Sequence, residues 1–288
     1  MRGDITSIKA ARFTFLIIVF LLLKSSIANC ELKDKREDAL GMRVPILLYH
    51  RFGPVVSDSM TVTTAVFRSH LKYLKEKGFT VIPLRQLVDY YQRRGDAPPP
   101  RSVVIVADDA HRSIYTEMLP LVKQYRIPVT LFIYPSAISN ASYAMTWKEL
   151  RELKKTALFD LQSHTYWHPN FKKEKRRLSD AEYEKFVWMQ LRKSRDRLEK
   201  ELDIKVDMLA WPFGIYDDEL IRHAADAGYR AAFTIERRSA GSRDNVNTMV
   251  IPRYLMRNSD KGEAFEMILG QPPGPKINNV LAREVKEK

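Results

Sequence analysis

Four groups of polar or aromatic residues stand directly after apolar runs in this chain. They are the pair Asp108 and Asp109, the pair His164 and His168, the single His50, and the Trp-Pro-Phe-Gly segment 211–214. Carboxylates and imidazoles are the side chains that most often move protons or bind metal ions. We therefore ask first what chemistry each group supports, and then which elements would bring the groups together.

Asp108 and Asp109 are adjacent carboxylates after Val-Val-Ile-Val-Ala. Burying both is costly unless they are paired or bound to a metal. Alternation along a strand would point them in different directions, so that one could bind metal while the other acts as a base. The alternative is a helix N-cap followed by a first-turn acid. For this pair by itself, both interpretations stay open.

His164 and His168 are separated by four positions and follow Phe-Asp-Leu-Gln-Ser. Such histidines share one face of a helix, or converge in a tight loop. Pro169 and Asn170 favour the loop. With Asp109 they would form a two-histidine, one-carboxylate set with open positions, which suits Zn²⁺, Fe²⁺ or Co²⁺. Two polar loop histidines without a ligand are the alternative.

His50 and the segment 211–214 are less specific by themselves. A lone histidine after a buried strand is typically a satisfied core residue, whereas beside the other groups His50 becomes a candidate general acid. Trp211 could form an aromatic wall, and the turn at Pro212–Gly214 could present a backbone N–H. An ordinary strand-ending turn is the alternative.

Eight short apolar runs bounded by turn residues are predicted to be strands. They are residues 44–49, 80–83, 102–107, 129–134, 159–162, 207–211, 229–234 and 249–253. Helical patterns lie between them, the longest over 180–202, and Thr146 with Glu149 forms a capping-box pattern. Repeated strand–helix order predicts a parallel α/β sheet, and seven or eight strands favour an irregular (β/α)7–8 barrel. All four groups follow strands, so they should meet at one end of that barrel.

The first 30 residues have the layout of an export signal. Three basic residues precede the apolar run 13–23, and small residues follow. The run is short for a membrane span, although an uncleaved anchor stays open. Cleavage after Ala28 competes with lipidation of Cys30 in a lipobox-like segment. The predicted organisation is a signal at 1–30, a polar spacer at 31–43, one domain at 44–269 and a peripheral tail at 270–288. The expected location is periplasmic, extracellular, or tethered to the outer side of the inner membrane.

Cys30 is the single cysteine, which excludes an intramolecular disulfide, thiol catalysis and cysteine-rich metal sites. The net charge is +13, and without residues 1–30, which carry four basic and one acidic side chain, it is still +10. Such a charge suits an anionic envelope or membrane surface, and a merely solvated basic surface is the alternative. Nucleic acid is not an expected partner, because acidic residues are interspersed with the basic ones except around 172–177.

The sequence resembles the polysaccharide deacetylases of the NodB-homology group, carbohydrate esterase family 4, from about Pro45 to Arg253. It most resembles the poly-β-1,6-N-acetylglucosamine N-deacetylases of biofilm systems, whose permuted motif order begins with a Tyr-His element. The matching segments are Leu48-Tyr49-His50, Asp108-Asp109-Ala110, His164-Thr165-Tyr166-Trp167-His168 and Pro212-Phe213-Gly214.

The resemblance implies a role for each matching residue. Asp108 would be the general base and His50 the general acid. One divalent ion, expected to be Zn²⁺ with Fe, Co or Ni as alternatives, would be bound by Asp109, His164 and His168. The Phe213 backbone N–H would stabilise the oxyanion, and Trp211 and Tyr166 would contact substrate.

The implied activity is hydrolytic removal of N-acetyl groups from an extracellular or envelope polysaccharide, with acetylated poly-N-acetylglucosamine as the expected partner. Two departures from the family pattern leave alternatives open. Ala110 replaces the glycine of the first motif, and Ala210 stands where many relatives carry an arginine that orients the base. Arg253 is a hypothetical substitute for that arginine. The alternatives are a catalytically impaired glycan-binding module and an esterase that removes O-acetyl groups.

Overall fold

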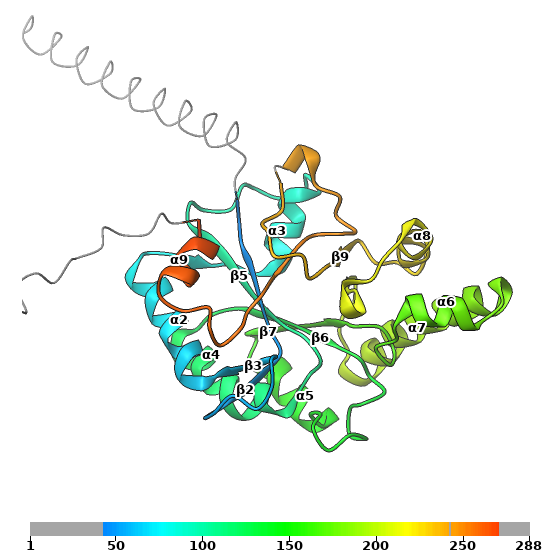
Figure 1. Ribbon diagram of the computed structural model, residues 1–288, viewed down its shortest axis with the longest axis horizontal. Coiled ribbons are helices and arrows are strands. Elements are labelled where there is room, and N and C mark those ends of the chain that lie inside the picture. Colours follow the sequence, from blue (N-terminus) through cyan, green and yellow to red (C-terminus); the bar gives the residue numbers. More distant parts are fainter. Residues whose placement is uncertain (1–42, 242, 271–288) are drawn as a thin grey trace, which may run out of the picture.

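The computed structural model describes residues 43–241 and 243–270 (Figure 1). The predicted signal at 1–30 with Cys30, the spacer up to residue 42 and the tail from residue 271 lie outside the described residues. Among the helices of the described part, none has the length and apolarity needed to cross a membrane.

Parallel strands form the centre of the fold. They are β1 (Ile46–Tyr49), β4 (Thr80–Val81), β5 (Ser102–Ala107), β6 (Val129–Ile133), β7 (Phe159–Ser163), β8 (Met208–Ala210), β9 (Ala231–Phe233) and β10 (Tyr254–Leu255). Their order is β10-β1-β5-β6-β7-β8-β9, with β4 pairing the first residues of β5. Ile251 makes a parallel bridge to Phe233 of β9 shortly before β10 pairs with β1, so the sheet curls back on itself. The prediction of an irregular (β/α) barrel is confirmed.

The last predicted strand, 249–253, is not a regular strand in the structure, and the strand there begins at Tyr254. Ile251 makes only an isolated bridge, and the regular ladder begins at Tyr254. Pro252 separates the two, and proline has no N–H to donate to a ladder. The apolar pattern identified the right segment, and the proline moved its regular pairing downstream.

Most of the helices lie on the outside of the barrel, and the one at Leu84–Tyr91 packs against the inner face of the strands. The helices are α2 (Thr64–Glu76), α3 (Leu84–Tyr91), α4 (Leu119–Tyr125), α5 (Trp147–Lys155), α6 (Phe171–Arg177), α7 (Asp180–Leu202), α8 (Asp218–Asp226) and α9 (Glu263–Ile268). The long helix has the predicted bounds. The capping box at Thr146 is present: its N–H donates to the Glu149 carboxylate at 2.7 Å, and its hydroxyl accepts from the Glu149 N–H at 3.2 Å. A two-stranded ribbon, β2 (Arg51–Gly53) with β3 (Thr61–Thr63), was not predicted, because each strand has three residues.

Apolar side chains on both faces of the strands are buried. Alternate residues such as Leu48, Val106 and Phe132 point into the barrel, where α3 packs against them. The other set, including Leu47 and Leu131, packs beneath the outer helices. Burial of both faces explains why the strands are nearly continuous Val, Ile and Leu runs.

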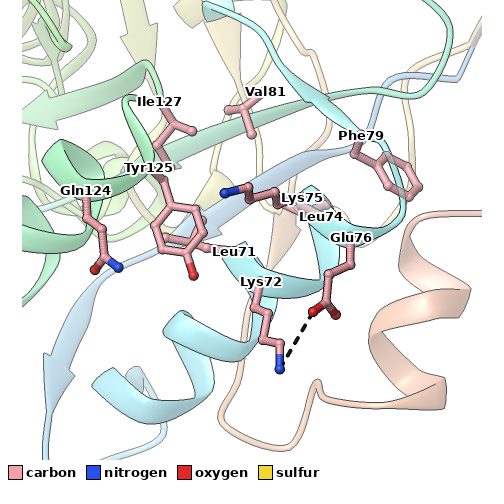
Figure 2. Close-up of a pocket in the computed structure, with 10 residues that line it drawn as sticks. All are labelled: Leu71, Lys72, Leu74, Lys75, Glu76, Phe79, Val81, Gln124, Tyr125 and Ile127. Atoms are coloured by element: carbon pink, nitrogen blue, oxygen red, sulfur yellow. Dashed lines mark ion pairs between the residues drawn. The ribbon is translucent and has the colours of Figure 1, made fainter.

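A groove of about 740 Å³ lies on the outer surface between α2 and α4 (Figure 2). Leu71, Leu74 and Ile127 line it, and Lys72 pairs with Glu76 at 3.6 Å beside them. Ile127 shortly precedes β6, so the groove is near the amino-terminal ends of the strands. It contains no residue of the predicted site.

Candidate active site

A cavity of about 490 Å³ lies at the carboxyl ends of the strands. Residues from almost every strand end surround it, and they are His50, Arg51, Met60, Asp108, Asp109, Tyr134, His164, His168, Trp211, Phe213, Ile235 and Leu255. The four groups singled out in the sequence therefore meet in one place, as parallel strands require.

Asp109, His164 and His168 bring one ligand atom each to within 4.8 Å of one another. His164 Nε2 lies 3.7 Å from an Asp109 carboxylate oxygen, and His168 Nε2 lies 3.9 Å from the same oxygen. These oxygen and nitrogen donors are the types that Zn²⁺ and related ions prefer.

The protonation states of His164 and His168 allow both rings to bind a cation. His164 Nδ1 lies 2.8 Å from the Ala210 carbonyl oxygen, so Nδ1 carries the hydrogen and the Nε2 lone pair is free to bind. Burial lowers the pKa of His164 to about 3 and also lowers the pKa of His168. Both rings are therefore neutral at pH 7, which is the form that coordinates metal.

Left-handed backbone places these ligands. Asp109 and Ala110 have φ of 73° and 54°, and Thr165 and His168 have φ of 63° and 60°. Each pair turns the chain sharply just past its strand. Ala110 adopts a conformation that glycine reaches without steric cost, so the family's glycine position keeps its turn although the residue differs.

Asp108 forms a buried ion pair with Arg253. The guanidinium donates to both carboxylate oxygens, at 2.8 and 2.9 Å, and both side chains are fully buried. Burial alone would raise the pKa of Asp108, yet the charge and the hydrogen bonds of Arg253 hold that pKa at about 2. Arg253 also donates from Nε to the Thr234 carbonyl, which fixes the fork in place. Arg253 thus contacts Asp108 as the sequence hypothesis required.

The two adjacent carboxylates have different environments. Burial raises the pKa of Asp109, whereas the pKa of Asp108 is lowered. Two carboxylates whose pKa values are pushed apart by their environments can take different chemical roles, such as base and metal ligand. The helix-cap alternative does not describe this pair, because Asp108 is engaged by Arg253 and Asp109 faces the two histidines.

His50 is buried at the cavity wall, and its Nδ1 has no hydrogen-bond partner among the described residues. Burial lowers the pKa of His50 below its ordinary value, and the negative charges of Asp108 and Asp109 offset this only in part. The preceding Tyr49 is anchored by a 2.9 Å hydrogen bond to His70 on α2. An unpaired buried nitrogen beside a cavity is suited to a group on a ligand.

The aromatic candidates separate into two sets. Trp211 lines the cavity as a buried wall, with its indole N–H donating to the Met249 carbonyl at 2.9 Å. Phe213 has φ of 56°, and its ring lies 4.6 Å from that of His168 and is 55% exposed. Tyr166 does not line the cavity, and its ring lies under the Lys193 ammonium at 4.2 Å. Its contact with substrate stays a prediction.

Five of the cavity residues escaped the sequence analysis, and two of them, Tyr134 and Arg51, carry polar groups. Tyr134 follows β6 and its hydroxyl bonds that of Tyr143 at 2.8 Å. Arg51 follows His50 and pairs with Asp58. Tyr134 is the last residue of the predicted strand 129–134. A polar group at the end of an apolar run is the signal that identified the other site residues, and it applies to Tyr134 as well.

Comparison with known proteins agrees with this geometry. Residues 95–232 match the polysaccharide deacetylase family. A poly-beta-1,6-N-acetyl-D-glucosamine N-deacetylase of Staphylococcus aureus (strain MRSA252) is 30% identical over 214 residues, which are 73% of this chain and 71% of that protein. The protein of the same description from Staphylococcus epidermidis is 27% identical over 260 residues, 84% and 85% of the two chains.

Solved structures share the fold. The Streptococcus pyogenes deacetylase PplD has a TM-score of 0.70 at 20% identity, covering 80% of this chain and 99% of that one. IcaB from Ammonifex degensii has a TM-score of 0.67 at 21% identity, covering 76% and 93%. The chain therefore belongs to the polysaccharide deacetylase family, carbohydrate esterase family 4. Its resemblance to poly-N-acetylglucosamine deacetylases, first read from its motifs, is confirmed by these relatives.

Proposed function

We propose that this polysaccharide deacetylase removes N-acetyl groups from poly-β-1,6-N-acetylglucosamine with one divalent metal ion, outside the cytoplasm. The observation that carries the proposal is the meeting of Asp109, His164 and His168 with an ionised Asp108 and an unpaired His50 in one cavity. The similarity to the staphylococcal poly-beta-1,6-N-acetyl-D-glucosamine N-deacetylases supports the glycan, and the export-like segment 1–30 supports the location.

Asp109, His164 and His168 would hold the ion, which when bound polarises a carbonyl and makes water more acidic. Zn²⁺ is the proposed ion because the donor set is two imidazoles and one carboxylate with room for further ligands. Fe²⁺, Co²⁺ and Ni²⁺ are alternatives that metal analysis separates.

The chain's own residues supply the proton transfers. Asp108 is ionised across neutral pH and takes the proton from the attacking water, with Arg253 keeping its carboxylate in one orientation. The amide carbonyl oxygen gains charge as water adds, and the Phe213 N–H would stabilise it. His50, in its protonated form, would then donate its proton to the nitrogen that leaves as the amine. The buried Trp211 wall excludes water from one side of the cavity.

The test is acetate release from acetylated β-1,6-glucosamine oligomers by purified protein, with its metal content measured in parallel. We expect release with bound metal, none after chelation, and recovery on adding Zn²⁺. His164→Ala should lose both metal and activity. A protein that binds no metal, or that releases acetate equally well after complete chelation, would contradict the proposal.

The same assay separates the alternatives. Faster release from O-acetylated xylan oligomers than from N-acetylated ones would assign an esterase. Glycan binding that persists in Asp108→Asn, without turnover by either form, would assign a binding module. The Arg253–Asp108 contact argues against impairment, because the base is oriented although position 210 is an alanine.

A further inference from the structure

The loop that carries His164 and His168 has an unusual backbone. It leaves β7 and holds both histidines within five residues, with left-handed residues at Thr165 and His168. Past His164, such a turn places no N–H in a regular ladder, so each buried N–H there needs another acceptor. Where these hydrogen bonds go determines how the two imidazoles are aimed.

Every N–H of residues 164–168 has a partner. His164 donates to the Ile133 carbonyl of β6 at 2.8 Å, and Thr165 donates to the Ser163 hydroxyl at 3.2 Å. His168 donates to the Thr165 hydroxyl, also at 3.2 Å. The two N–H groups in the middle of the loop, those of Tyr166 and Trp167, have no partner in the loop or in the sheet.

Gln190 of α7 accepts both of them. Its side-chain oxygen lies 3.2 Å from the Tyr166 nitrogen and 3.0 Å from the Trp167 nitrogen. Gln190 is fully buried on a helix whose other buried residues are mostly apolar. Its amide nitrogen contacts the Met189 sulfur at 3.8 Å, so the oxygen makes the interactions that matter.

A second residue of α7 holds the start of the loop. The Ser194 hydroxyl donates to the Thr165 carbonyl at 2.9 Å and lies 2.8 Å from the Ser163 hydroxyl. The Tyr229 hydroxyl donates to Ser163 at 2.8 Å from the other side. Residues of α7 thus contact three successive loop residues lying between the two histidines, and Gln190 and Ser194 have no hydrogen bond to either ring.

We infer that Gln190, with Ser194, is a positioning residue that sets the geometry of the metal-binding histidines from outside the cavity. A buried carboxamide on a helix costs free energy unless its oxygen is satisfied, and here both of its bonds go to the loop. The rigid helix α7 therefore fixes the loop, and the loop fixes the direction of each imidazole. This inference rests on the metal centre proposed above.

The chain contains a matched control. Gln162 of β7 is also fully buried, and its side-chain oxygen also accepts two successive N–H groups, those of Asp207 and Met208, both at 3.0 Å. These donors lie at the start of β8 and not in the metal-binding loop. Gln162→Met and Gln190→Met each remove a side-chain oxygen that accepts two N–H groups, and Gln162→Met also removes the amide's donations to Asp160 and to the Lys205 carbonyl. Gln190→Glu keeps an acceptor oxygen in place.

The experiment titrates chelator-stripped full-length protein with Co²⁺ and follows its visible absorption. We expect Gln190→Met to weaken Co²⁺ binding about tenfold or more and to change its spectrum, because outer residues around metal sites typically contribute factors of about 10 to 100. Gln190→Glu should bind Co²⁺ like the wild type. Gln162→Met should lower thermal stability as Gln190→Met does, and leave the spectrum unchanged.

The outcomes separate the two proposals. Wild-type protein that binds no Co²⁺ would overturn the metal centre, and this inference with it. A wild type that binds Co²⁺, with Gln190→Met equal to it in affinity and spectrum, would overturn the inference alone. Equal weakening by Gln162→Met would also overturn it, because the effect would then be general loss of core packing.

Discussion

The two ends of the barrel both contain aspartate–arginine ion pairs, and they use them differently. At the amino-terminal end, Asp207 contacts Arg85 at 2.9 Å, Arg230 at 3.1 Å and Lys205 at 3.5 Å. Arg85 comes from α3, so the network joins the helix inside the barrel to the strands. At the carboxyl end, Asp108 has one cationic side chain, Arg253, in bidentate contact.

The two ion-pair networks differ in how much hydrogen-bonding and metal-binding capacity they leave for a ligand. Around Asp207 the charged groups satisfy one another, and they link α3 to the strands. Around Asp108, the His50 nitrogen has no partner among the described residues and Asp109 faces two neutral histidines, so bonding capacity remains for a ligand. The same kind of interaction therefore links elements at one end of the barrel and orients a cavity carboxylate at the other.

Arg253→Met should produce the largest effect, because it removes the partner of a buried charge. Loss of one member of a buried pair costs about 3–5 kcal/mol of unfolding free energy. The misplaced base should lower kcat by about 100-fold or more. Denaturant unfolding and acetate release measure the two effects.

Arg253→Lys is the control. It keeps the positive charge without the two parallel N–H donors of the guanidinium, and it should recover stability more than activity. Activity within about threefold of the wild type in Arg253→Met would remove Arg253 from the positioning of Asp108.

Most of this carboxyl end was predictable from local sequence. His50, Asp108 and His164 each follow an apolar strand, and parallel strands end at one edge. The sequence could suggest Arg253 as the orienting arginine, but it could not show the contact with Asp108, because the two residues are 145 positions apart. Gln190 carries no local signal at all, since its role depends on how α7 packs against the loop. The two three-residue strands of the ribbon were equally hidden, because runs of that length hold little periodicity.

Asp207→Asn tests the other end. It removes the charge shared by three cations and should lower the unfolding free energy by about 3 kcal/mol. The kcat of the folded enzyme should stay unchanged, because the network does not reach the cavity. Asp160→Asn is the control: Asp160 also pairs with Arg85, but its side chain is 33% exposed, and it should cost about 1 kcal/mol or less. A large fall in kcat for Asp207→Asn would contradict the division between the two ends.

His70 gives the carboxyl end a pH dependence of stability. Its Nδ1 bonds the Tyr49 hydroxyl at 2.9 Å, its Nε2 bonds the Asp260 carbonyl, and burial lowers its pKa to about 4. The unfolded chain, with a histidine pKa of about 6.5, binds the proton more readily, so stability is full above that pH and falls toward pH 4.

Between pH 7 and pH 5 this linkage should cost about 2 kcal/mol. His70→Gln cannot take up the proton, so its unfolding free energy should fall less over the same interval. Urea unfolding at the two pH values measures the difference. Identical pH dependence in both proteins would show that His70 is not held neutral by the fold.

Ala110→Gly should have the smallest effect, although it restores the family's glycine beside Asp109. Relief of the left-handed alanine gains about 1–2 kcal/mol. The extra freedom of glycine in the unfolded chain costs about 0.5–1 kcal/mol, and loss of a buried methyl costs about 0.8 kcal/mol. These contributions nearly cancel, so the unfolding free energy should change by less than about 1 kcal/mol. The turn is already formed, with the Ala110 carbonyl accepting from the Met145 N–H at 3.0 Å, so kcat should change less than about twofold. A large gain in activity would instead mean that the alanine displaces Asp108 or Asp109 from the geometry described.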